Sequence, residues 1–98
     1  MSTAMSERTA PALAVLDELL PALRALAPGT HRDQMVEETE ALRRAVAAFH
    51  MEAIRFRIYT VDRLIRADGD APALRALVER LRDALEAAGF HTRSHAAP

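Results

Sequence analysis

The chain contains 98 residues, carries a formal net charge of −1 and has no cysteine, and half of its residues are hydrophobic. This length supports one domain with its own core, and the lack of cysteine excludes disulfide bonds and thiolate chemistry. Arginine is the basic residue throughout and lysine is absent, but the balanced charge creates no long-range field that would attract nucleic acid.

Abundant alanine, leucine, glutamate and arginine indicate an all-α protein. No apolar run approaches the about 20 residues that are needed to span a bilayer. Residues 1–7 lack the basic start of a signal peptide, and the first apolar stretch is interrupted by Asp17 and Glu18. The sequence therefore favours a cytoplasmic protein that does not cross a membrane.

The first expected helix covers residues 10–27 and follows a polar tail, residues 1–8, that we expect to be flexible. Thr9 is a candidate N-cap, and Pro11 would fall in the first turn, where its missing N–H costs nothing. Apolar residues then recur at alternating spacings of three and four, which predicts one stripe of a helix. The stripe consists of Leu13, Leu16, Leu20, Leu23 and Ala27.

The second expected helix is unusually long, because no glycine or proline interrupts residues 30–67. About 38 residues at 1.5 Å each would form a rod of roughly 57 Å. The apolar pattern changes along it, since its second half is apolar on two faces. One stripe runs through Met35, Thr39, Leu42, Val46 and Phe49 and continues as Ala53, Phe56 and Leu64. The other, displaced around the axis, consists of Met51, Ile54, Ile58, Val61 and Ile65.

The third expected helix covers residues 71–88. Gly69 suits the left-handed position that ends the long helix, and Asp70 is a candidate cap for the next one. Gly89 followed by Phe90 predicts a Schellman ending, with glycine at C′ and a hydrophobic residue at C″. We expect residues 91–98 to form a second flexible tail.

These elements predict a single helical domain, residues 9–90, of three helices in the order short, long, short. Each short helix would cover only half of the long one and leave part of its apolar surface bare. An antiparallel homodimer, in which two long helices cross and form four-helix-bundle layers, would bury that surface. The alternative is a monomer whose long helix bends or breaks near Ala47-Ala48. The expected dimer interface consists of Phe49, Met51, Ile54, Ile58, Val61 and Ile65.

His50 would lie near the middle of the long helix and close to the two-fold axis, where it could act as a ligand or a pH-sensitive residue. With Glu52 and Glu38 it is a candidate for a metal site. Di-iron bundles usually combine Glu with a Glu-x-x-His pair, which this chain lacks. Packing of the histidine and surface salt bridges of the two glutamates are the stronger interpretation.

A polar ridge with spacings of three and four is a candidate surface for an anionic ligand or a partner: Arg55, Tyr59, Arg63 and Arg66. Glu52 and Asp62 neutralise part of this ridge, so nucleic-acid binding is the second alternative only. The sequence contains no nucleophile elbow, glycine-rich phosphate loop or zinc-protease motif, which favours a protein without enzymatic activity.

The resulting hypothesis is a non-enzymatic, homodimeric interaction protein that serves as an adaptor, a scaffold or an accessory subunit. Its partners would be a second copy of itself and another protein, with no cofactor. The first alternative is a bundle that binds a small ligand or a metal ion near His50 at the dimer centre.

Overall fold

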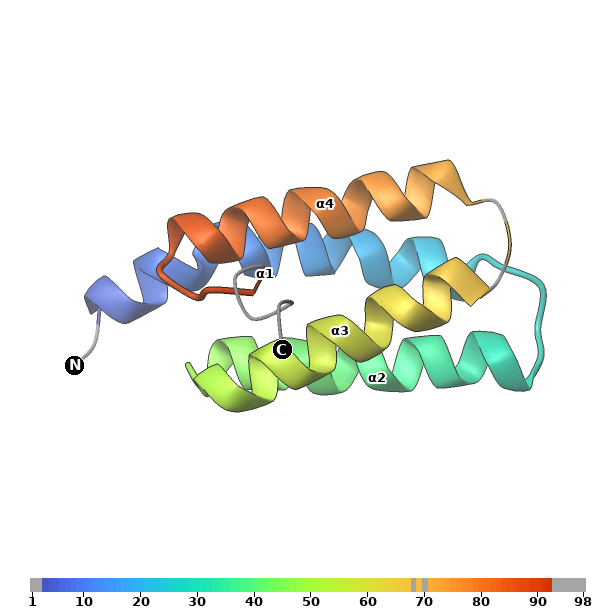
Figure 1. The fold of residues 1–98 in the computed structure, drawn as a ribbon, viewed down its shortest axis with the longest axis horizontal. Coiled ribbons are helices and arrows are strands. Elements are labelled where there is room, and N and C mark those ends of the chain that lie inside the picture. The colour runs from blue at the N-terminus through green and yellow to red at the C-terminus, as the bar shows by residue number, and fades with distance from the viewer. Residues whose placement is uncertain (1–2, 68, 70, 93–98) are drawn as a thin grey trace.

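The structure is a computed structural model that describes residues 3–67, 69 and 71–92, and in this part of the chain it contains four α-helices. They run alternately up and down as an antiparallel bundle (Figure 1). The helices are α1 (Thr3–Arg24), α2 (Thr30–Ala47), α3 (Met51–Ala67) and α4 (Pro72–Ala87). The prediction of an all-α fold is confirmed.

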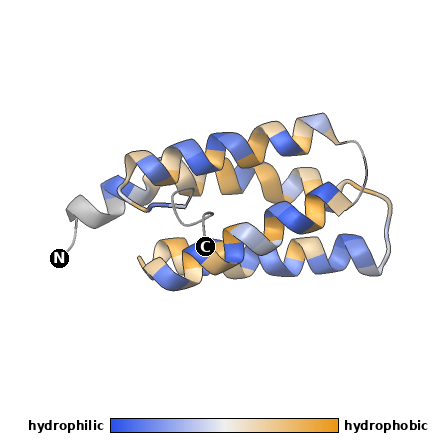
Figure 2. Cartoon of the chain, in the orientation of Figure 1, coloured by the Kyte–Doolittle hydropathy of each residue, from blue (hydrophilic) through white to orange (hydrophobic). Residues whose placement is uncertain are grey.

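The helices pack in a ring, in which α1 contacts α2 and α4, and α3 contacts the same two neighbours. Each helix carries apolar and polar residues on different sides (Figure 2), and the apolar sides meet in one shared core. Thr39 lies in this core, and its hydroxyl has no hydrogen-bond partner among the described residues. The largest fully buried side chains are Leu16, Leu19, Leu23, Met35, Leu42, Val46, Ile54, Ile58, Ile65, Leu81, Leu85 and Phe90.

The prediction of one continuous helix over residues 30–67 is wrong, because this segment forms α2 and α3 with a turn between them. Phe49 adopts a left-handed backbone conformation with φ of 59°. The amide of Phe49 donates to the carbonyl of Val46 at 3.0 Å, and that of His50 donates to the carbonyl of Ala45 at 2.9 Å. These two bonds form a Schellman motif with phenylalanine in the place usually taken by glycine.

The break follows from the two displaced apolar stripes of this segment. On one continuous helix, Ile54 and Ile58 would point about a third of a turn away from Leu42 and Val46. A reversal of the chain at residues 48–50 removes this offset, since both stripes can then face the same core. The outcome corresponds to the alternative of a break near Ala47-Ala48, and a single chain builds four helices without a shared long helix.

The first helix also differs from its expected bounds. It begins at Thr3, so residues 3–8 are helical, and Thr9 lies inside the helix as a buried residue instead of capping it. Arg8, at the end of this additional helical segment, is anchored to the end of α4, because its Nη2 donates to the carbonyl of Ala88 at 2.5 Å. Its guanidinium also lies 5.2 Å from the ring centroid of Phe49.

The end of α4 agrees with the prediction. Gly89 has φ of 99°, and the amide of Phe90 donates to the carbonyl of Leu85 at 2.9 Å, as a Schellman motif requires. Gly69, after α3, has φ of 98° and thus takes the left-handed conformation expected of it. The expected cap Asp70, and residues 1–2 and 93–98 of the two expected tails, lie outside the described residues.

An arginine–carboxylate pair crosses every seam between neighbouring helices. Most of these side chains are partly exposed, so each pair adds little stability, but together they favour one arrangement of the four helices. The pairs are Arg43–Asp17 (2.8 Å) between α2 and α1, Arg57–Glu38 (2.7 Å) between α3 and α2, Arg82–Asp62 (3.2 Å) between α4 and α3, and Arg80–Glu18 (2.9 Å) between α4 and α1.

None of the helices in the described part of the chain is both long enough and apolar enough to cross a membrane.

Candidate functional site

The exposed face of α3 carries the large hydrophobic side chains that the described core leaves uncovered. Met51 is 45% exposed, Phe56 61% and Tyr59 59%. The opposite face of α3 is buried, with Ile54, Ile58, Val61 and Ile65 in the core. Because α3 is a regular helix, the rings of Phe56 and Tyr59 are held on a rigid element and not on a loop.

The aromatic residues belong to a regular stripe that we call the α3 ridge, formed by Glu52, Phe56, Tyr59 and Arg63. Their spacings of four, three and four residues place them along one side of the helix, as in the seam of a coiled coil. The ridge therefore has an acidic end, an aromatic middle and a basic end.

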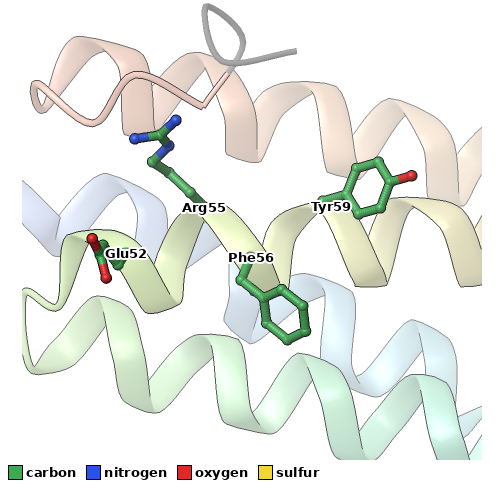
Figure 3. A pocket seen from close by; sticks show the side chains of 4 residues that line it. All are labelled: Glu52, Arg55, Phe56 and Tyr59. Atoms are coloured by element: carbon green, nitrogen blue, oxygen red, sulfur yellow. The ribbon is translucent and has the colours of Figure 1, made fainter. Parts of the chain in front are cut away.

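A shallow depression of about 410 Å³ lies on this face. It is lined by Glu52, Arg55, Phe56 and Tyr59, whose side chains surround it in Figure 3. Residues at i, i+3, i+4 and i+7 of one helix are the four that form the hole for a knob from a facing helix. The depression thus has the form of a packing socket, open to solvent on one side.

The charges around the ridge are partly engaged. The guanidinium of Arg57 lies 5.5 Å from the ring centroid of Phe56 and also pairs with Glu38 at 2.7 Å. The guanidinium of Arg63 lies 6.0 Å from the ring centroid of Tyr59. Glu52 is exposed and forms no ion pair with a described residue, so its carboxylate can pair with a cationic group of another molecule.

The structure brings together three of the four residues of the polar ridge expected from the sequence. Tyr59 and Arg63 are exposed on the outward side of α3, and Arg55 beside them is half-buried. Arg66 is exposed nearby, but its guanidinium is hydrogen-bonded to Asp62 at 3.1 Å. The sequence pattern assigns Phe56 to an apolar stripe of a continuous helix, and the expected ridge therefore does not include it. Its place between Glu52 and Tyr59, four and three residues away, is the signal that indicates this surface.

The residues expected at a dimer interface lie in three different environments. Ile54, Ile58, Val61 and Ile65 are buried by the chain's own helices and are not on its surface. Phe49 is half-buried, with its ring against Phe90 at 4.8 Å between centroids. Only Met51 of the six expected interface residues is among the exposed large hydrophobic side chains of the described chain.

His50, Glu52 and Glu38 are not assembled into a metal-binding group, since no cluster of three or more such side chains occurs in the described residues. His50 lies in the turn at one end of the bundle, where its carbonyl accepts the amide of Ile54 at 3.0 Å. Glu38 is engaged by Arg57 on the next helix. His50 therefore occupies the start of α3 and not the centre of a long helix.

Two further depressions, of about 420 and 300 Å³, are rimmed by charged side chains that already pair with one another. Arg24 binds Glu40 at 2.6 Å beside the first, and Arg66 binds Asp62 at 3.1 Å beside the second. Neither has an aromatic side chain in its lining. The α3 ridge is therefore the best candidate for a functional surface on this part of the molecule.

The comparisons with known proteins found no protein-family model, no curated protein and no solved structure that matches this chain.

Proposed function

We propose that this chain is a non-enzymatic helical interaction protein, an adaptor, scaffold or accessory subunit, that binds its partner through the α3 ridge. The observation that carries this proposal is the exposure of Phe56 and Tyr59, 61% and 59%, three residues apart on one regular helix. Single exposed hydrophobic residues, scattered over a protein surface, are normal. Two exposed aromatic rings beside the same socket form a cluster, and such clusters indicate an interaction site.

The composition of this surface resembles the energetic centre of a protein interface. Tyrosine and arginine are enriched among residues whose removal weakens binding most, and both flank the socket. Full burial of one large apolar side chain contributes about 1.5–3 kcal/mol. Aromatic rings that are already fixed on a helix lose little conformational entropy when they are covered.

The proposal is tested by photo-crosslinking in cells that express the full chain. A photoreactive amino acid at position 56 or 59 should yield a crosslinked product of defined mass, which mass spectrometry identifies. The same amino acid at Ala73, exposed on α4, is the matched control and should yield none. If positions 56 and 59 give no product beyond that of the control, the α3 ridge is not a binding surface.

The two alternatives lack a comparable feature. A ligand or metal site at His50 would need converging polar groups, but His50 lies in the turn after α2, and Glu38, within α2, is paired with Arg57. Nucleic-acid binding would need a basic face, whereas the arginines that cross the seams are paired with carboxylates. The α3 ridge supports recognition of a protein better than either.

A further inference from the structure

We propose that the partner of the α3 ridge is the α3 ridge of a second copy of this chain, packed antiparallel about a two-fold axis that passes between Phe56 and Tyr59. This inference rests on the function proposed above and names the partner. It places the homodimer on the outward face of α3, away from the isoleucine stripe that the core buries.

The spacing of the ridge is the same in both directions, four, three and four residues. When such a stripe packs against its own copy in the antiparallel sense, the first residue faces the last and the second faces the third. Glu52 then faces Arg63 of the partner subunit, and Phe56 faces Tyr59 of the partner subunit. Both contacts occur twice, because the axis repeats them.

The socket agrees with the same register. Its four residues are centred between positions 55 and 56 of α3. The two-fold operation that pairs Glu52 with Arg63 brings positions 59 and 60 of the partner over that centre. Tyr59 of the partner subunit would therefore be the knob, and its ring would lie between Phe56 and the aliphatic part of Arg55.

The charges select this arrangement over its alternatives. A parallel pairing would place Glu52 against Glu52 and Arg63 against Arg63, which is repulsive at both ends. In the antiparallel pairing the carboxylate of Glu52, which has no ion-pair partner among the described residues, gains a guanidinium. Opposite charges at the two ends therefore fix both the direction and the register.

A dimer built on one helix is expected to be weak. The 17 residues of α3 extend about 25 Å, which offers less surface than a stable interface of ~1,600 Å² requires. We expect a dissociation constant on the order of tens of micromolar, with exchange between copies.

The test is sedimentation equilibrium of the full chain at concentrations up to about 1 mM, which brackets the expected dissociation constant. The native chain should dimerise, and each single charge reversal, Glu52→Arg or Arg63→Glu, should raise the dissociation constant at least tenfold. An equimolar mixture of these two variants should form a heterodimer, because every Glu–Arg contact is restored between unlike chains. The double variant Glu52→Arg/Arg63→Glu should dimerise like the native chain.

The matched control is Arg75→Glu, which makes the same charge change on the exposed side of α4 and should leave the dimer unchanged. Circular dichroism verifies that each variant keeps its helices. The homodimer proposal is overturned if the native chain stays monomeric at all concentrations. It is also overturned if the charge reversals at Glu52 and Arg63 leave the dissociation constant unchanged. If position 56 then crosslinks to a different protein, the proposed function stands without the homodimer, and if it crosslinks to nothing, both fall.

Discussion

The rings of Phe49 and Phe90 meet edge to face, with centroids 4.8 Å apart and planes inclined by 61°. These residues follow the ends of α2 and α4, and the same pair of Schellman hydrogen bonds closes both helices. Arg8 joins them from α1, with its guanidinium over Phe49 and a hydrogen bond to the carbonyl of Ala88. Three helices are thus tied together at one end of the bundle, close to where α3 begins.

Phe49 combines a favourable ring contact with an unfavourable backbone conformation. Phe49→Ala should destabilise the fold by about 2 kcal/mol, because the half-buried ring is lost while φ of 59° still strains an L-residue. Phe49→Gly should be about 1 kcal/mol more stable than Phe49→Ala, since glycine adopts this conformation freely. Urea denaturation measures both. The strain is absent if the alanine variant equals or exceeds the glycine variant, as it would inside a regular helix.

Gly89 and Gly69 form a natural comparison, because their φ angles are 99° and 98° but their surroundings differ. A Cβ at Gly89 would lie 2.8 Å from Nη2 of Arg8, whereas one at Gly69 would meet nothing within 4 Å. Both alanine variants should lose about 1 kcal/mol to backbone strain. Gly89→Ala should lose about 1 kcal/mol more, since Arg8 must leave the carbonyl of Ala88.

The melting temperatures of both glycine variants, measured with and without Arg8→Ala, separate these two costs. Removal of Arg8 should abolish the difference between Gly89→Ala and Gly69→Ala. A difference that persists in that background would mean that the close approach of Arg8 is not its cause.

The buried hydroxyl of Thr39 should be a net cost to stability, because it lost water without gaining a partner among the described residues. Thr39→Val replaces it by a methyl group of similar size and should raise the free energy of unfolding by about 1 kcal/mol. The control is Thr60→Val, since the hydroxyl of Thr60 donates to the carbonyl of Phe56 at 3.1 Å. Chemical denaturation should show a gain only for Thr39, and a loss at this position would indicate that its hydroxyl is satisfied in solution.

Two exposed ion pairs should shape the response of the fold to acid. Hydrogen bonds from Arg43 and Arg80 lower the pKa of Asp17 and of Glu18 below their usual values of 3.8 and 4.5. The folded state therefore binds fewer protons than the unfolded chain near these values. The stability that the pairs contribute is fully present above pH 5 and is lost as the pH falls through the lowered pKa values.

The double variant Asp17→Asn/Glu18→Gln isolates this contribution. It should be less stable than the native chain at neutral pH, and the difference should shrink as the pH falls below the usual carboxyl pKa values. Urea midpoints measured from pH 2 to pH 7 follow it, with Glu37→Gln on the exposed side of α2 as the control. If the urea midpoints of the native chain and of the double variant differ by the same amount at every pH, the pairs have no role in acid sensitivity.

Local signals in the sequence predicted much of this fold. The apolar spacings identified the helical class, and Gly69 and Gly89 marked two helix ends through the left-handed conformation that only glycine adopts without strain. The turn after α2 could not be predicted in this way, because Phe49 adopts the left-handed conformation although it is not glycine. What stabilises it there is tertiary: the ring of Phe90 and the guanidinium of Arg8, which lie 41 residues away in each direction.

The candidate site was predictable in part. The arginines and Tyr59 of α3 stood out by their spacing, but whether Phe56 would face the core or the solvent depended on the position of the chain reversal. Once α3 is separate from α2, the isoleucines occupy the core, and Phe56 lies outside with Tyr59. A stripe of residues indicates a face of a helix, and only the packing of the whole chain decides which face is buried.

The ring of four helices also has a consequence for the order in which the chain folds. Three of its seams join helices that follow one another in sequence, and contacts of this kind form early and fast. The seam between α1 and α4 joins residues as distant as Arg8 and Ala88, 80 positions apart. On a chain emerging from the ribosome, α1, α2 and α3 can assemble before α4 exists, and the docking of α4 closes the bundle last. Changes in that closing seam should therefore act mainly on the rate of unfolding.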